Sequence, residues 1–299
     1  MGRGERRLTA DASRSDSLVN AANTQPRRWH QALRNRNLLI GGTIILLLVA
    51  AALLAPWLTP YQPLVQDHEH ALESPNLSHP FGTDNYGRDI LTRVLYGARI
   101  DLRVGLIAVI APFIIGIVLG SLSGYYGRWI DTLSMRAVDI VQAFPFLVII
   151  IAIVAVLGPG LNNMYLAVAI VAWVVYARLI RSAVLVEKTK DYVTAARSIG
   201  GNDLRILGRH LFPNVLAPCI VYAMADMALY IGLVAALSYL GLGVPPPAPE
   251  WGAMIASGQA FMTTAWWICA LPGAAIVITG IALSLIGDGI AAILRPARR

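Results

Sequence analysis

Few residues of this 299-residue chain are of the types that do chemistry, and they form no recognisable catalytic set. The sequence contains no Gly-x-x-x-x-Gly-Lys-Ser/Thr phosphate loop, no His-Glu-x-x-His zinc motif and no Gly-x-Ser-x-Gly nucleophile motif. His68 and His70 stand beside Asp67 and Glu69 and could hold a metal weakly, although a solvated loop explains them better. We therefore expect no catalytic residues, no metal site and no cofactor.

One carboxylate, Asp226, falls inside a long apolar run, 215–242. A charged group at mid-depth in a bilayer is costly, so this side chain is expected to face a polar cavity or a partner. Two interpretations stay open. Asp226 lines a translocation path, or it makes a structural hydrogen bond to an adjacent helix, in which case it could also be a neutral acid.

A second informative region is the polar segment 187–214, which follows the fourth apolar run. Tyr192, Ala195, Ala196 and Ile199 recur at the spacing of one helical face, and their mostly small side chains leave a shallow surface. Such a surface suits docking into a groove of another protein, but an ordinary interfacial loop has the same periodicity. The pattern alone does not decide between the two.

The same segment contains punctuation for two short helices. Gly200 and Gly201 are expected to end the first helix, and Asn202 or Asp203 can cap the next, which Pro213 follows.

The elements that must position these residues are membrane helices. Hydrophobic residues make up 57% of the chain and charged residues only 14%, and the apolar residues come in long blocks. A bilayer core about 30 Å thick takes about 20 helical residues. The sequence therefore predicts an all-α polytopic membrane protein with six transmembrane helices, at 38–58, 104–124, 140–157, 159–177, 215–242 and 265–286.

The orientation follows from the basic residues, 20 of which fall on one side of these spans out of a total of 24. We expect a cytoplasmic basic arm (1–37), an external loop (59–102), a membrane core (103–294) and a cytoplasmic C-terminus (295–299). The net charge of +7 is explained by residues that flank apolar spans, so nucleic acid is not an expected partner.

Segment 187–214 resembles the EAA loop through which permease subunits of bacterial ABC importers contact their ATPases. The matching residues are Thr194-Ala195-Ala196, Gly200 and His210-Leu211-Phe212-Pro213. Thr194, His210 and Phe212 depart from the family's Glu, Ile and Leu. The resemblance implies ATPase-coupling roles for Asp191, Tyr192, Ala195, Ala196, Gly200, Asp203, Arg209 and Pro213.

Other stretches resemble one branch of that family, the second permease subunit of dipeptide/oligopeptide/nickel importers. They are His79-Pro80-Phe81-Gly82-Thr83-Asp84, Gly87-Arg88-Asp89, Tyr96-Gly97-Ala98-Arg99, Gly124-Tyr125-Tyr126-Gly127, Met135-Arg136-Ala137-Val138-Asp139-Ile140, Ala143-Phe144-Pro145, Leu240-Gly241-Leu242-Gly243, Pro249-Glu250-Trp251-Gly252 and Gly287-Asp288-Gly289. The resemblance implies the type I permease fold of ABC importers and a gate-like external element at Glu250 and Trp251.

The resemblance also implies a bacterial cytoplasmic membrane protein with several partners: a homologous second permease subunit, two ATP-binding subunits that hydrolyse ATP, and an external solute-binding protein. The implied solutes are di- or oligopeptides, with nickel or glutathione-like solutes as alternatives. An ion-coupled secondary transporter is the rival from another class, but it would usually show paired broken helices or more charges within the spans. A membrane-embedded enzyme would need a converging acid, base or metal set within the bilayer.

Overall fold

The computed structural model describes residues 35–294, in which all regular structure is helical apart from one isolated bridge between Thr83 and Asp89. The all-α prediction is thus confirmed. In chain order the helices are α3 (Arg36–Leu58), η1 (His68–His70), α4 (Ile90–Tyr126), α5 (Arg128–Gln142), α6 (Phe146–Leu157), α7 (Leu161–Glu187), α8 (Asp191–Ser198), α9 (Asp203–Arg205), η2 (Ile206–Leu211), α10 (Phe212–Tyr239), α11 (Trp251–Gly258), η3 (Gln259–Phe261) and α12 (Trp267–Leu294). Most of the expected arm, 1–37, and the expected tail, 295–299, lie outside the described residues.

Five helical stretches are long and apolar enough to cross a membrane, and a sixth span is obtained if one bent pair is counted. The five are α3, α4, α7, α12 and the continuous stretch Asp203–Tyr239. The bent pair is α5 and α6, which meet at 83°. The expected third span, 140–157, is therefore not one straight helix. The break precedes Pro145, which has no backbone N–H and disfavours helical geometry in the residue before it.

The loop expected over 59–102 is shorter than the sequence suggested, because α4 begins at Ile90. Asp89 caps that helix, and its Oδ2 accepts hydrogen bonds from Thr92 N at 2.7 Å and Thr92 Oγ1 at 2.6 Å. Arg93 and Asp101 in the first turns of α4 are buried instead of solvated. These two charged side chains, which suggested a solvated loop, thus lie in the protein interior.

The close packing of α4 against α7 depends on three glycines spaced four residues apart. A Cβ atom built at Gly116 or Gly120 would overlap the Tyr176–Ala177 stretch of α7, and one at Gly124 would lie 2.9 Å from Arg181 O. Small residues at this spacing let membrane helices approach closely when no hydrophobic effect drives their association. The approach brings Tyr176 into the interior of the bundle.

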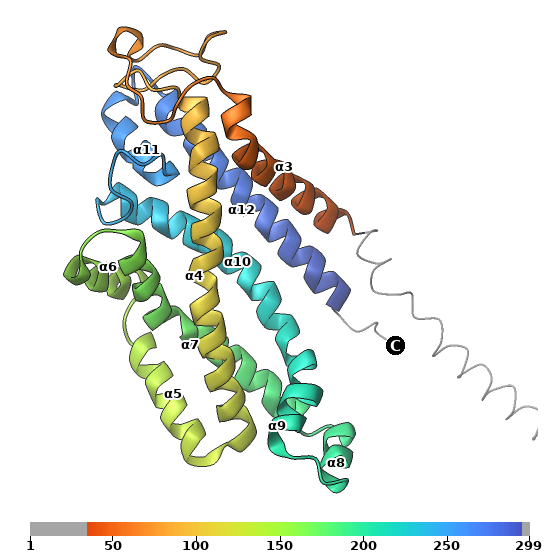
Figure 1. Ribbon diagram of the computed structural model, residues 1–299. Helices are drawn as coiled ribbons and strands as arrows, with labels where there is room; N and C mark the ends of the chain where they lie inside the picture. The colour runs from red at the N-terminus through yellow and green to blue at the C-terminus, as the bar shows by residue number, and fades with distance from the viewer. Residues whose placement is uncertain (1–34, 295–299) are drawn as a thin grey trace, which may run out of the picture.

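Figure 1 shows how these helices divide the molecule into two ends. α4 runs along its whole length, with loop 59–89 and α11 at one end and with α8 and α9 at the other. We call these the α11 end and the α8 end. α3 lies alongside α12, and α6 projects on the opposite side of the bundle (Figure 1).

Candidate functional site

The segment expected to couple to other subunits begins with a short helix closed by a tight turn. After α8, Gly201 N donates to Ala196 O and Gly200 N donates to Arg197 O, both at 3.0 Å. This pair of bonds is the Schellman arrangement, which needs a residue with positive φ after the helix. Gly200 supplies that residue with φ of 82°. The prediction that the two glycines end the first helix is confirmed.

The second helix of the segment starts as expected but does not stop. Asn202, one of the two candidate caps, is the one used, because its Oδ1 accepts from Arg205 N at 2.8 Å. The six-residue π-helix Ile206–Leu211 then runs directly into α10. Pro213 lies in the first turn of α10. The segment is thus a continuous extension of a transmembrane helix.

The face expected from periodicity is divided between the protein interior and the surface. Val193 and Ala196 are buried in the main core of the molecule. Ala195 faces outward, Ile199 is 86% exposed, and Leu204 beyond the turn is 80% exposed. The surface presented at the α8 end is therefore formed by Ala195, Ile199 and Leu204, and Ala196 does not belong to it.

Tyr192, also placed on that face, is tied to its own chain. Its hydroxyl donates to Glu187 Oε1 at 2.7 Å and accepts from Asn214 Nδ2 at 3.2 Å. Partial burial and the Glu187 carboxylate both raise the pKa of Tyr192. The side chain joins α8 to the end of α7 and to the start of α10. Helical periodicity does not identify Glu187 or Asn214 as partners of Tyr192, because the three residues come from different helices.

Asp203 ties the segment to α4. Its carboxylate accepts a hydrogen bond from Tyr125 Oη at 2.7 Å, and the Arg197 guanidinium lies 5.3 Å from the centre of the Tyr125 ring. Lys188 Nζ donates to Gly124 O at 2.6 Å in the same region. The remaining residues of the predicted coupling set are exposed: Asp191, Arg209 and Pro213.

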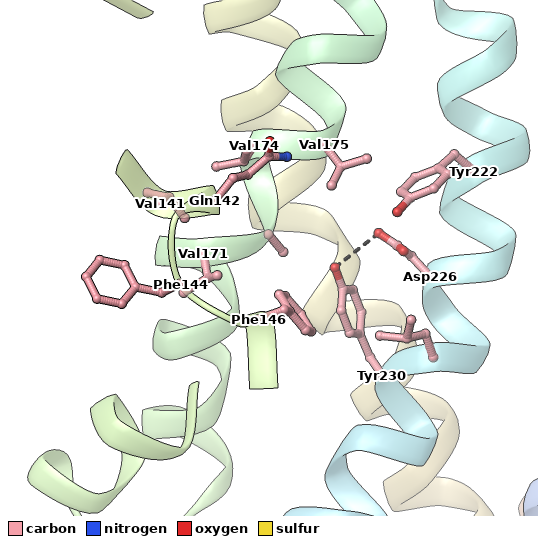
Figure 2. Close-up of a pocket in the computed structure, with 12 residues that line it drawn as sticks. Val141, Gln142, Phe144, Phe146, Val171, Val174, Val175, Tyr222, Asp226 and Tyr230 are labelled. Atoms are coloured by element: carbon pink, nitrogen blue, oxygen red, sulfur yellow. Dashed lines mark hydrogen bonds between the residues drawn. The ribbon is translucent and has the colours of Figure 1, made fainter. Parts of the chain in front are cut away.

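A cavity of about 380 Å³ lies beside the bend between α5 and α6. Figure 2 shows Phe144 and Phe146 at the bend, α7 side chains along one wall, and Tyr222, Asp226 and Tyr230 on α10 across from them. This volume is within the range of about 300–1,000 Å³ that is usual for small-molecule sites. The straight third span expected from the sequence would have had no bend at this place.

Asp226 lies about midway along α10, 5% exposed, at the edge of this cavity. Its Oδ2 accepts from Tyr230 Oη at 3.0 Å, one turn along the same helix (Figure 2). Within residues 35–294 it makes no ion pair. This hydrogen bond lies within α10, and both interpretations of Asp226 stay open. The role of Asp226 in a path stays a prediction.

Glu250 and Trp251, for which a gate was implied, are both fully buried at the α11 end. Glu250 caps α11, and its two carboxylate oxygens accept from Gly252 N at 2.7 Å and Ala253 N at 2.8 Å. Trp251 Nε1 donates to Val94 O at 3.0 Å, which fixes α11 against α4. Both side chains are thus used to hold α11, and a gate role stays a prediction.

A buried network of charges at the α11 end was not recognised in the sequence. Asp84 Oδ2 lies 2.7 Å from Arg88 Nε and 3.7 Å from Arg93 Nε, and all three side chains are at most 5% exposed. His79 Nδ1 lies 3.0 Å from Asp89 Oδ1 in the same loop. The matched stretches His79–Asp84 and Gly87–Asp89 are therefore the residues that fold this loop onto α4. The only available signal was the resemblance itself.

Metal chemistry has no obvious place in the described part of the chain. Within residues 35–294 no group of three or more His, Cys, Asp or Glu side chains is arranged to hold a metal ion. His70 Nδ1 instead lies 2.8 Å from Asp67 Oδ2 in an exposed pair.

Comparisons with known proteins agree with this architecture. Residues 116–299 match the family described as binding-protein-dependent transport system inner membrane component. Residues 27–75 match the N-terminal transmembrane domain of oligopeptide transport permease C.

Relatives with curated names cover nearly the whole chain. The di/tripeptide transport system permease protein DppC of Pseudomonas aeruginosa (strain UCBPP-PA14) is 43% identical over 274 residues, 90% of each chain. The dipeptide transport system permease protein DppC of Escherichia coli (strain K12) is 41% identical over 90% of this chain and 91% of its own. The glutathione transport system permease protein GsiD of Pectobacterium atrosepticum is 40% identical over 90% and 89%.

A solved structure shares the fold. A chain of the MetNI methionine ABC transporter, in an inward-facing conformation, aligns with a TM-score of 0.55 at 20% identity, over 68% of this chain and 97% of that chain. That likeness concerns the fold alone. With two family matches and relatives above 40% identity, the chain belongs to the binding-protein-dependent inner membrane components, the multi-pass permease subunits of bacterial ABC importers.

Proposed function

We propose that this chain forms half of the pathway through which an ATP-driven importer moves di- or oligopeptides across the bacterial cytoplasmic membrane. The relatives whose printed names specify dipeptides or di/tripeptides support the solute class. A homologous permease subunit supplies the other half, two ATP-binding subunits hydrolyse ATP, and an external binding protein delivers the peptide. The chain itself supplies the pathway and not the hydrolysis.

The observation that carries the proposal is the apolar surface at the α8 end. Ile199 and Leu204 expose large apolar side chains although the segment that bears them is firmly attached to the bundle. Apolar groups exposed on an ordered polar segment are typical of a surface that another protein covers. We assign this surface to the ATP-binding subunit.

The attachments of the segment give a route for coupling. Tyr192 bonds to residues of α7 and α10, Asp203 bonds to α4, and the stretch Asp203–Tyr239 is continuous. A displacement of α8 is therefore transmitted to the helix that carries Asp226. Rocking of such a packed bundle needs two arrangements that differ by only a few kcal/mol. In this coupling route, the contacts of Glu250 and Trp251 make α11 move as one unit.

The orientation of the chain is part of the proposal, with the α8 end and both termini in the cytoplasm. Cysteine labelling from outside tests it with Leu77→Cys at the α11 end and Leu204→Cys at the α8 end, two highly exposed sites. The natural Cys219 and Cys269 are buried, so background labelling should be low. Labelling of the Leu77 site alone is expected. Labelling of the Leu204 site alone would reverse the orientation.

Reconstitution tests the function. The chain, its second permease and its ATP-binding subunits are placed in vesicles with the binding protein, and ATP-dependent entry of L-alanyl-L-alanine is measured. Entry that requires ATP and the binding protein is the expected result. Entry driven by an ion gradient without ATP would favour a secondary transporter instead.

Glutathione is the second candidate solute, because a relative that is 40% identical over 90% of this chain bears that name. Competition in the same vesicles separates the candidates. Excess dialanine should block uptake of labelled dialanine, whereas excess glutathione or Ni²⁺ should not. Stronger competition by glutathione would change the solute class and leave the importer role intact.

A further inference from the structure

The cavity beside Asp226 has an unusual balance of charge. A carboxylate removed from water is costly unless a cation or several hydrogen bonds compensate it. Asp226 receives one hydrogen bond from Tyr230, and no basic side chain among residues 35–294 pairs with it. No cation among the described residues therefore balances this carboxylate, and a cationic ligand would balance it.

A second observation points to a ligand at this place. Tyr176 is fully buried, yet its hydroxyl has no hydrogen-bond partner among the described residues. Its ring meets that of Tyr222 edge-on, with centroids 5.3 Å apart. Buried hydroxyls normally find a partner. Figure 2 shows the Tyr222 and Tyr230 side chains beside the Asp226 carboxylate at the wall of the cavity.

The chemistry of the walls selects the kind of cation. A primary ammonium group has three N–H donors, and the carboxylate and the neighbouring tyrosine hydroxyls are acceptors for them. Tyr222, Tyr230, Phe144 and Phe146 add aromatic rings, which attract organic cations. A hard metal ion would instead need several charged or carbonyl oxygens, which this apolar cavity lacks.

We propose that Asp226, with Tyr222 and Tyr230, forms a transient site for the primary ammonium group of the solute in transit. The inference rests on the proposed function, since it needs a solute that passes through this bundle. The free N-terminus of a peptide is such a group. One carboxylate and neutral hydroxyls make a site strong enough to receive the solute and weak enough to release it.

Direct binding tests this inference apart from transport. The assembled transporter, in lipid nanodiscs without the binding protein, is titrated with L-alanyl-L-alanine and with N-acetyl-L-alanyl-L-alanine, which lacks the ammonium. The free amine should bind at least about tenfold more tightly. Asp226→Asn should remove that preference and Asp226→Glu should retain part of it. Asp139→Asn, at an exposed pair with Arg178, is the matched control and should keep the preference.

The outcomes separate the two proposals. Equal binding of the two probes by the natural chain, or an unchanged preference in Asp226→Asn, overturns the ammonium site even if dialanine is imported. Displacement of dialanine by Na⁺ or Ni²⁺ at equal concentration also overturns it, because the site then takes an inorganic cation. A preference that depends on Asp226 in a transporter that does not import dialanine sustains the site and refutes the proposed solute.

Discussion

Side chains at the two ends of the molecule have opposite environments. At the α11 end, charged and polar groups such as Asp84, Arg88 and Glu250 are buried and find partners within the chain. At the α8 end, Ile199 and Leu204 remain exposed on a segment that is well attached. Burial with internal partners indicates a role in folding, and exposure of apolar groups indicates a missing partner.

This comparison changes how the conspicuous motifs are understood. Glu250 and Trp251 belong to a stretch that resembles the family, yet their contacts fix α11 to α4. Ile199 and Leu204 occupy none of the positions that match the family motifs, yet both expose large apolar side chains at the α8 end. Substitutions at the α11 end should therefore act on stability, and substitutions at the α8 end on coupling.

Asp84→Ala should have the largest effect. The substitution leaves the guanidinium groups of Arg88 and Arg93 buried without their carboxylate, which costs about 3–5 kcal/mol. Thermal unfolding of the purified chain in detergent measures the loss. Asp139→Ala, which breaks an exposed pair with Arg178, should change stability by no more than about 1 kcal/mol. Equal effects of the two substitutions would contradict the division between the ends.

Gly200→Val should have an intermediate effect. Its φ of 82° costs a residue with a Cβ about 1–2 kcal/mol, and a β-branched side chain tolerates it worst. Gly200→Asn is the matched variant, since Asn adopts positive φ more readily.

A third variant, Gly200→Trp, separates two reasons for a glycine at position 200. No atom of the chain lies within 4 Å of a Cβ built there, so the fold itself leaves room for a side chain. If uptake in reconstituted vesicles survives Gly200→Asn but not Gly200→Trp, the glycine serves close docking as well as the turn. Unchanged uptake with all three variants would argue that the segment is only a solvated loop.

Ile199→Ser combined with Leu204→Ser should leave stability within about 0.5 kcal/mol, because both side chains are exposed. The same variant should lose the stimulation of ATP hydrolysis by the loaded binding protein, because the docking surface is gone. Leu77→Ser removes an exposed apolar side chain at the α11 end and serves as the control for stability. Normal stimulation in the double variant would place the docking surface elsewhere.

The exposed His70–Asp67 pair should give the smallest effect, a weak pH dependence of the stability of loop 59–89. The Asp67 carboxylate raises the pKa of His70 above its ordinary value of 6.5, and His70 lowers the pKa of Asp67 below its ordinary value of 3.8. A raised histidine pKa stabilises below pH 6.5, and that contribution is lost as pH rises through the raised value. A lowered carboxyl pKa stabilises above pH 3.8, and that contribution is lost as pH falls through the lowered value.

The pair therefore supports the loop most between about pH 4 and 6.5. Amide hydrogen exchange in the loop, corrected for its intrinsic pH dependence, should show slightly more protection at pH 6 than at pH 8.5. His70→Asn should abolish the difference, and His68→Asn should keep it. A difference that survives His70→Asn would assign it to another group.

Much of the fold was readable from the sequence. For the majority of the helix ends, the apolar blocks predicted the boundary to within a few residues, because a bilayer demands about 20 apolar residues per span. The glycine pair and Asn202 located the turn between α8 and α9, because both act through local backbone geometry. Positive φ and capping depend on neighbouring residues only, which a sequence displays directly.

The errors concern places where distant residues meet. Arg93 and Asp101 suggested solvent, but they are buried by contacts with residues far along the chain, such as the Trp251 backbone N–H that donates to Asp101 at 3.2 Å. The bend before Pro145 was missed because hydropathy is continuous across it. The spacing of Gly116, Gly120 and Gly124 was visible, but its partner surface on α7 was not.

The sequence by itself determined that this chain is a helical membrane protein whose segment 187–214 holds a short helix closed by glycines, because hydropathy, helical periodicity and turn chemistry are all local along the chain. Only the tertiary structure decided which residues are available to act. It tied Tyr192 and Asp203 to the bundle, left Ile199 and Leu204 exposed, and placed Tyr222 and Tyr230 beside Asp226 at the wall of one cavity. Burial and partnership depend on which helix faces are packed together, and local patterns do not encode that.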